Sequence, residues 1–127
     1  MARMLIWIDR EHAKLFALEG SEWRKEELRW SHLDHHTHRR GNADKESAKF
    51  YEQVAQKVAH AMEIVIVGPG IAKQHFAAFL SDHHPQTRRA VVDVEASEAD
   101  LTDGELRDFA RRTFDRIDKL TGTAALT

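Results

Sequence analysis

The sequence of 127 residues contains no cysteine and only two prolines, Pro69 and Pro85. Without cysteine the chain can form neither disulfide bonds nor thiolate zinc sites, which is typical of proteins in a reducing compartment. No apolar run is long enough to span a membrane, and the apolar stretch before Asp9 is too short for a signal peptide. We therefore expect a cytoplasmic protein that has no contact with a membrane.

Several motifs of catalysis and nucleotide binding are also missing. The sequence has six glycines, but they form neither the phosphate-binding loop G-x-x-x-x-G-K-[ST] nor the dinucleotide fingerprint G-x-G-x-x-G. It has no G-x-S-x-G nucleophile elbow, and a cysteine nucleophile is excluded. These absences argue against the P-loop, Rossmann and α/β-hydrolase types of site.

Residues 63–73 form the stretch around which the rest of the sequence is arranged. Four β-branched residues, Ile64 to Val67, run without alternation, which is typical of a strand covered on both faces. Residues 68–70 then end the strand, and a helix is predicted over residues 71–80. A helix N-terminus after a glycine turn can present unpaired N–H groups to an anion. The candidate anion-binding residues are therefore Gly68, Gly70 and Lys73. Alternatively, the glycines serve only a tight turn.

The order of the predicted elements indicates the fold class. Apolar patterning predicts five strands, at residues 4–9, 12–18, 22–32, 64–67 and 88–94. Three helices are predicted: one capped by Asp44 with an apolar stripe from Phe50 to Met62, one at residues 71–80, and one after a capping box of Thr102 and Glu105. We expect one α/β domain, a mixed five-stranded sheet with three helices in a ribonuclease H-like arrangement. Its core spans residues about 4–120, and residues 121–127 should fray.

Charge is distributed unevenly along the chain, although the net charge is only −2. Between residues 93 and 118 there are nine acidic residues and four arginines, a balance of −5. Between residues 32 and 49 there are four basic and three acidic residues, a balance of +1, and four histidines add charge as the pH falls. Basic, stacking-capable segments of this kind bind single-stranded RNA. The candidate RNA-binding residues are His35, His36, His38, Arg39, Arg40, Lys45 and Lys49.

The same segment allows two other interpretations. Nitrogen and oxygen ligands for zinc or nickel could come from His32, Asp34, His35, His36 and His38. A structural zinc site usually draws its ligands from two segments, however, and the only other histidine cluster is His83–His84. Alternatively, the loop simply faces water. We expect no metal and no cofactor.

Asp9 ends the first predicted strand, where ribonuclease H-like nucleases place a metal-binding carboxylate. Two-metal catalysis needs several carboxylates that converge on ions about 4 Å apart, and only Asp9 has a suitable position. A hairpin-turn aspartate is the simpler interpretation, so we expect no catalytic activity. A metal-dependent nuclease or phosphodiesterase that uses Asp9 and the histidines is the alternative from another functional class.

The third predicted strand, residues 22–32, offers a further alternative. Trp23 and Trp30 have opposite parity on it, so one of them should point away from the face that the other covers. An exposed tryptophan on an edge strand is typical of a partner surface. We therefore also consider a homodimer formed through this edge strand.

Residues 66–80 resemble the middle domain of Pelota and of the archaeal and eukaryotic peptide-chain release factors. The matching residues are Pro69, Gly70, Lys73, Phe76, Phe79 and Leu80. Four motifs are closer still to the small single-domain proteins named "translational machinery protein", in the same order: Trp7 to Asp9, His35 to Gly41, Gly68 to Lys73 and Thr102 to Leu106. The resemblance covers residues about 4–120.

This resemblance implies a protein linked to translation that contacts the ribosome, its tRNA or its rRNA. Release factors carry Gly-Gly-Gln in the loop before the first helix, where this sequence has His35 to Asn42, and the tripeptide occurs nowhere in the chain. Peptide release is therefore not implied. Resemblance and charge pattern together predict a non-catalytic, translation-associated protein that binds the ribosome or RNA through the histidine–arginine loop and the glycine turn with Lys73.

Overall fold

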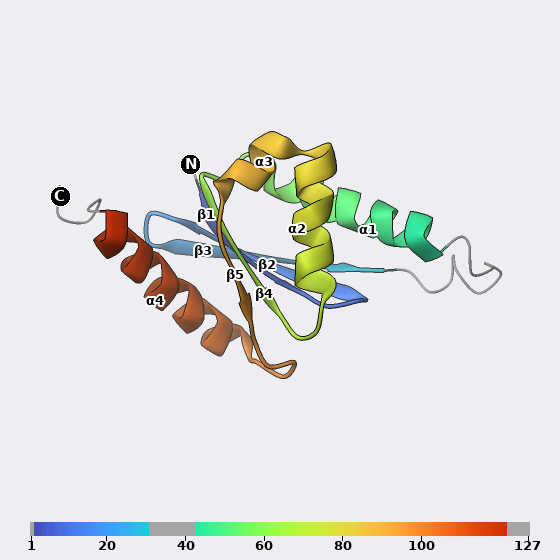
Figure 1. Ribbon diagram of the computed structural model, residues 1–127. Coiled ribbons are helices and arrows are strands. Elements are labelled where there is room, and N and C mark those ends of the chain that lie inside the picture. Colours follow the sequence, from blue (N-terminus) through green and yellow to red (C-terminus); the bar gives the residue numbers. More distant parts are fainter. Residues whose placement is uncertain (1, 31–42, 122–127) are drawn as a thin grey trace.

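The fold is built on one five-stranded sheet (Figure 1). The computed structural model describes residues 2–30 and 43–121. The strands in this part of the chain are β1 (Arg3–Ile8), β2 (His12–Glu19), β3 (Glu22–Arg29), β4 (Glu63–Gly68) and β5 (Val91–Ala96). The helices are α1 (Ala43–Val58), α2 (Ala72–His83), α3 (Pro85–Ala90) and α4 (Asp103–Thr121).

The sheet is mixed, and its strand order is β3-β2-β1-β4-β5. β2 pairs antiparallel with both β1 and β3, because short turns join these three strands into hairpins. β4 and β5 are each reached through helices, and β4 lies parallel to both β1 and β5. The predicted mixed five-stranded sheet is therefore confirmed. The parallel pairing also brings the carboxyl ends of β1, β4 and β5 to one end of the sheet.

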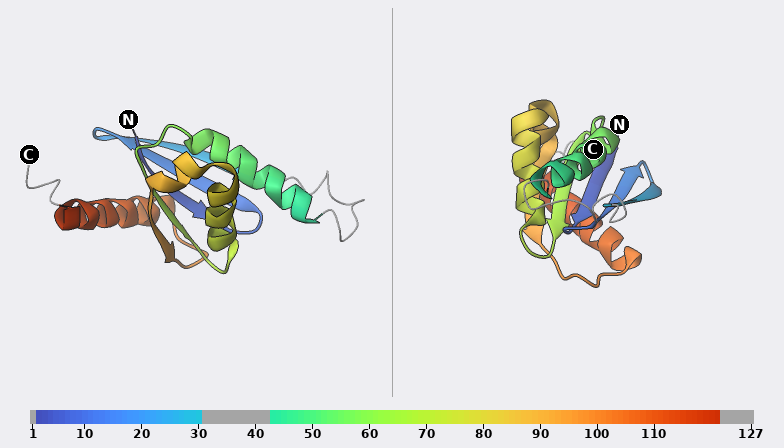
Figure 2. Two further views of the ribbon diagram at one scale, coloured as in Figure 1. Left: turned by 45° about the horizontal axis from the view of Figure 1, so that its top comes forward. Right: turned by 90° about the vertical axis from the view of Figure 1, so that its right-hand side faces the viewer.

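Helices cover both faces of the sheet (Figures 1 and 2). On one face α1 and α2 bury Phe50, Val54, Val58, Phe76 and Leu80. On the other face α4 buries Leu106, Ala110 and Phe114. The four residues from Ile64 to Val67 are fully buried because they alternate between these two cores. The prediction of a central strand that is covered on both faces is thus confirmed.

One predicted strand is partly wrong. The sequence predicts a strand over residues 88–94, but residues 85–90 form helix α3, and β5 begins only at Val91. Pro85 occupies the first turn of α3, where its fixed φ and its missing N–H are compatible with a helix. Thr87 is the buried residue of this short helix. The described part of the chain therefore has four helices where the sequence predicts three.

Two element ends also differ from the prediction. α1 ends at Val58 and does not extend to Met62, which is 45% exposed. The chain turns here because the N–H of Ala61 donates to the carbonyl of Val58 (3.1 Å), and the N–H of Met62 donates to the carbonyl of Ala2 (2.7 Å). The second bond joins the residue before β4 to the residue before β1, so the two strands start side by side. β3 ends at Arg29 and not at residue 32.

The capping box predicted before the last helix is present. The N–H of Thr102 donates to Oε1 of Glu105 (3.0 Å), and the N–H of Glu105 donates to Oγ1 of Thr102 (3.1 Å). These bonds satisfy backbone groups at the start of α4. With 19 residues, α4 is the longest helix of the described chain, but neither it nor any other described helix is long and apolar enough to cross a membrane.

The two tryptophans at β3 lie on opposite faces of the sheet, as their parity predicts. Trp30 packs against the core under α1 and α2, and Trp23 packs against the core under α4. Both residues are half-buried, and the guanidinium of Arg111 lies over the Trp23 ring, 5.6 Å from its centroid. The exposed tryptophan on which the prediction of a homodimer depends is therefore not found on β3.

Candidate functional site

The glycine turn lies at the end of the sheet where β1 and β4 stop. A Cβ atom on Gly68 would overlap the carbonyl oxygen of Ile8, so only glycine allows this approach of the two strands. Gly68 also accepts a hydrogen bond from the N–H of Ser97 (3.1 Å), which follows β5. Gly70 has a φ of 64°, in the left-handed region that favours glycine. Both glycines thus have a structural task in the turn.

Lys73 lies in the first turn of α2, but its side chain points inward. The residue is only 6% exposed, and its ammonium donates a hydrogen bond to the carbonyl oxygen of Gly70. Lys73 therefore closes the glycine turn from inside, whereas the predicted anion site needs it at the surface. The cation that does reach the surface beside the turn is Arg10, which is exposed and forms no ion pair with the described residues.

Asp9 fixes the turn between β1 and β2. Its Oδ1 accepts hydrogen bonds from the N–H groups of Glu11 (2.8 Å) and His12 (2.7 Å), and its own N–H donates to the carbonyl of His12 (3.0 Å). This is the geometry of a hairpin-turn aspartate. Within residues 2–30 and 43–121, no three histidine or acidic side chains gather in a way that could hold a metal ion.

Most of the histidine–arginine segment lies outside the described residues. This applies to His32, Asp34, His35, His36, His38, Arg39 and Arg40. Lys45 belongs to α1, but its side chain is also outside the described part, and Lys49 is exposed on the same helix. The structure does place both ends of the segment, since Trp30 follows β3 directly and Ala43 begins α1.

A cavity of about 370 Å³ lies between the end of β3, the N-terminal half of α1 and the first turn of α2. We call it the rim groove. Its lining residues come from four segments of the chain: Arg10 and Glu11, then Trp30, then Ser47 and Tyr51, and finally Ile71, Ala72 and His75. A second cavity of about 530 Å³ shares four of these residues and continues to Pro69 and Gly70. The right-hand view in Figure 2 faces this end of the molecule.

The rim groove has two aromatic side chains in fixed positions. Trp30 packs against the core, and Tyr51 packs against Phe76 and Phe79, with ring centroids 5.8 and 5.9 Å apart. Burial raises the pKa of the Tyr51 hydroxyl, so the hydroxyl stays protonated at neutral pH. The groove therefore combines rigid aromatic surface with the exposed charge of Arg10.

No motif in the sequence identifies the rim groove. Arg10 and His75 carry no motif, and Tyr51 is indistinguishable from the other apolar members of the α1 stripe. The groove exists because α1 and α2 lie side by side on the sheet and bring four distant segments together. The one signal of the groove in the sequence is that two aromatic residues, Trp30 and Tyr51, lie on either side of the basic segment.

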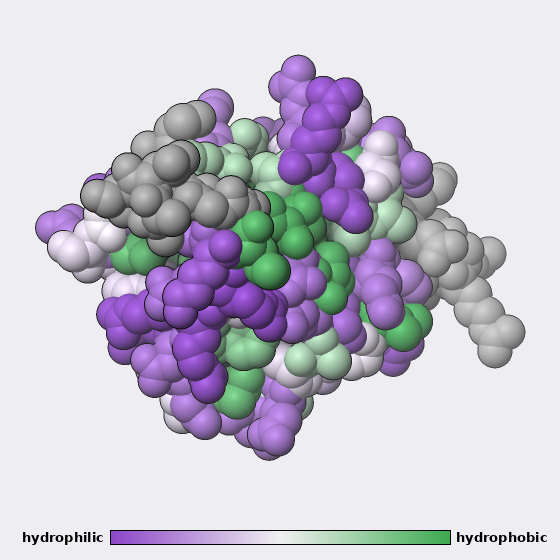
Figure 3. All heavy atoms as spheres, turned by 60° about the vertical axis from the view of Figure 1, so that its left-hand side comes forward, coloured by the Kyte–Doolittle hydropathy of each residue, from purple (hydrophilic) through white to green (hydrophobic). Residues whose placement is uncertain are grey.

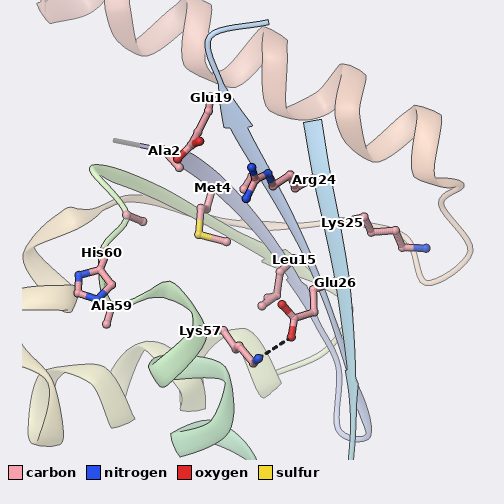
Figure 4. A pocket seen from close by; sticks show the side chains of 12 residues that line it. Ala2, Met4, Leu15, Glu19, Arg24, Lys25, Glu26, Lys57, Ala59 and His60 are labelled. Atoms are coloured by element: carbon pink, nitrogen blue, oxygen red, sulfur yellow. Dashed lines mark ion pairs between the residues drawn. The ribbon is translucent and has the colours of Figure 1, made fainter. Parts of the chain in front are cut away.

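A larger cavity, of about 790 Å³, lies at the opposite end of the sheet. Met4 and Leu15 point into it, and an ion pair between Lys57 and Glu26 (2.8 Å) closes one side (Figure 4). Figure 3 brings this end of the molecule forward and shows apolar surface bordered by hydrophilic side chains. Of the candidate site residues that the structure describes, none lines this cavity.

Sheet order, helix placement and glycine turn together define a Pelota- and release-factor-like α/β domain. Among solved structures, the chain is similar to Pelota of Archaeoglobus fulgidus, with a TM-score of 0.66 and 19% identity over 98% of this chain and 34% of that one. It is similar to Pelota of Thermoplasma acidophilum, with a TM-score of 0.62 and 15% identity over 86% of this chain and 31% of that one. The archaeal translation termination factor aRF1 matches with a TM-score of 0.53 and 17% identity over 96% of this chain and 42% of that one.

These likenesses confirm the expected resemblance at the level of the fold. The chain spans about a third of the length of the Pelota structures that it matches. No protein-family model matches the sequence, and no curated protein does.

Proposed function

We propose that this is a cytoplasmic, non-catalytic, translation-associated protein that binds the ribosome, through its rRNA or a bound tRNA, at the end of the sheet where β1 and β4 stop. The fold supports this, because the solved structures with similar domains are Pelota proteins and a translation termination factor. The sequence supports a binding role over peptide release, because it contains no Gly-Gly-Gln.

The observation that carries the proposal is the position of the described residues on either side of the basic segment. Trp30, before the segment, and Ser47 and Tyr51 of α1, after it, all line the rim groove beside the exposed Arg10. The segment contributes His35, His36, His38, Arg39 and Arg40, and α1 adds Lys45 and Lys49. In this proposal their charges act on the same phosphate-bearing partner.

Gly68, Gly70 and Lys73 have an indirect part in this proposal. Because Lys73 is buried against Gly70, it adds little charge to the surface. Instead, the three residues set the position of Ile71, which is 56% exposed beside Arg10. The glycine turn thus gives the binding surface its shape, and the arginines and histidines give it its charge.

Co-sedimentation with ribosomes across a salt series tests the proposal. We expect binding at low salt that weakens steeply as salt increases, since contacts to phosphates release counterions. The variant Arg39→Ala/Arg40→Ala should lose most of this binding. A matched control is Arg111→Ala/Arg112→Ala, which removes an adjacent pair of exposed arginines from α4 on the opposite face of the sheet. Absence of co-sedimentation at low salt, or equal losses in both variants, contradicts the proposal.

A further inference from the structure

The rim groove has the size and the lining of a small-ligand site. Its volume of about 370 Å³ lies within the range of roughly 300–1,000 Å³ that is usual for such sites. The adjoining cavity of about 530 Å³ extends the groove along the glycine turn. An occupant can therefore place one part inside the groove and another part along the turn.

The aromatic walls of the groove favour a planar occupant. The ring packing of Tyr51 against Phe76 and Phe79, and the packing of Trp30 against the core, fix both side chains before any ligand arrives. A planar ring can then stack on them with little loss of side-chain freedom. The protonated hydroxyl of Tyr51 and the hydroxyl of Ser47 supply hydrogen-bonding groups within the same cavity.

The charged groups of the groove differ in what they can bind. Arg10 is exposed at the mouth and can bind an anionic group such as a phosphate. Glu11, a carboxylate that accepts hydrogen bonds, lines the same cavity, so a ligand that is anionic throughout is disfavoured. A heterocycle with one attached phosphate fits this lining better than a polyanion does.

We propose that the rim groove binds a nucleobase together with its phosphate, either as an unpaired base of RNA or as a free nucleotide. For an RNA base, this inference deepens the proposed function and rests on it; for a free nucleotide, it does not. The stacking surface comes from Trp30 and Tyr51, and the phosphate lies at Arg10. Stacking on aromatic side chains tolerates every base, so we expect little preference among the four.

The test observes the three tryptophan indole N–H resonances by NMR while ligands are added to the full chain. The probes are AMP, UMP, a single-stranded RNA hexamer and, as a ligand without a base, ribose 5-phosphate. We expect the resonance of Trp30 to shift with the nucleotides and the hexamer, while that of Trp23, on the opposite face, stays in place. Ribose 5-phosphate should leave both resonances unchanged.

Two variants with matched controls separate the base from the phosphate. Trp30→Leu should weaken binding about tenfold or more because a stacking ring is lost, whereas Trp23→Leu should not. Arg10→Gln should weaken binding of AMP but not of adenosine, and Arg24→Gln, at the opposite end of the sheet, should change neither. Arg10 is exposed, so its variant should fold even if Trp30→Leu does not.

The outcomes distinguish this inference from the proposed function. Tighter binding of the hexamer than of AMP identifies RNA as the source of the base, and equal binding identifies a free nucleotide; either result supports the inference. Binding of ribose 5-phosphate as strong as that of AMP, or an unshifted Trp30 resonance, overturns it. If ribosomes still co-sediment in that case, the proposed function stands alone. If nucleotides bind at Trp30 but ribosomes do not co-sediment, only the proposed function fails.

Discussion

The α4 face of the sheet and the rim groove differ in what their charged side chains contact. On the α4 face, acidic and basic residues pair with each other between the helix and the sheet. These pairs are Lys25 with Asp103 (2.6 Å), Arg116 with Asp93 (3.0 Å), and Arg3 with Asp118. At the rim groove, the exposed Arg10 forms no ion pair with the described residues.

This difference changes how the excess of acidic residues near the C-terminus should be interpreted. Residues 93–118 have a balance of −5, which suggests an acidic surface for a partner. In the structure Asp103 and Asp118 of α4 pair with cations of the sheet, and Asp93 of β5 pairs with Arg116 of α4. These carboxylates therefore help to hold α4 on the sheet. No such pair neutralises Arg10 within the described chain. We therefore expect substitutions on the α4 face to change stability, and substitutions at the rim groove to change binding.

The largest effect on the α4 side should come from Phe114→Ala. Phe114 is 2% exposed in the core under α4, and the guanidinium of Arg3 lies over its ring, 5.3 Å from the centroid. We expect the free energy of unfolding to fall by about 3–5 kcal/mol, the usual cost of such a cavity. Urea denaturation measures the loss, and Phe109→Ala, at a half-buried position of the same helix, should cost less. Equal effects of the two variants contradict the assignment of Phe114 to this core.

Gly68→Ala tests the glycine turn beside the rim groove, where the backbone itself is constrained. The added Cβ would overlap the carbonyl of Ile8 and push β1 and β4 apart. We expect a loss of about 3 kcal/mol, at the upper end of the usual cost of overpacking. Gly70→Ala is the control, because its Cβ meets no atom and only the left-handed φ of 64° opposes it. That strain should cost about 1 kcal/mol. A ranking of the two variants in the opposite order would show that the turn is not closed in this way.

The parts of the fold that the sequence predicts are those with a local signal. The run from Ile64 to Val67 identifies a strand buried on both faces, because no polar residue interrupts it. Thr102 and Glu105 identify the start of α4, because both partners of the capping box lie within one turn. Helix α3 escapes prediction because its six residues are too few for a helical period, and Pro85 is also typical of a turn.

The candidate site is harder to predict, because it depends on side-chain directions and on distant contacts. The position of Lys73 in the first turn of α2 suggests an exposed cation, but the sequence does not reveal that the carbonyl of Gly70 is placed to accept from it. The rim groove joins residues as distant as Arg10 and His75. Their proximity follows from how α1 and α2 pack on the sheet, and no spacing in the chain records it.

A smaller effect should follow from Asp118→Asn, with a characteristic dependence on pH. The hydrogen bond from Arg3 lowers the pKa of Asp118 below its ordinary value of 3.8. A lowered pKa means that the charged form stabilises the fold above pH 3.8 and that this contribution is lost as the pH falls through the folded-state value. We expect a loss of about 1 kcal/mol at neutral pH. The unfolding curves of wild type and variant should converge as the pH falls below 3.8.

The control for this pair is Asp115→Asn, on the exposed side of the same helix. It removes the same charge from α4 without removing the hydrogen bond to Arg3, so it should have little effect at any pH. Urea denaturation of both variants between pH 2 and 7 provides the measurement. Parallel curves for wild type and Asp118→Asn throughout this range would mean that Arg3 and Asp118 do not interact in solution.

The smallest effect should come from Lys25→Gln, which tests how far the ion pairs of the α4 face contribute when they are open to water. Lys25 is exposed and donates to Asp103 (2.6 Å) across the gap between β3 and α4. An exposed pair contributes about 0.5 kcal/mol, and the difference from wild type should disappear near 1 M salt, where charges are screened within about 3 Å. Arg24→Gln, at the next position of β3 but on the other face and without an ion pair in the described chain, should show no such salt dependence. A salt-independent loss in Lys25→Gln would instead indicate that its aliphatic stem packs against α4, so that this face is held by apolar contact and not by charge.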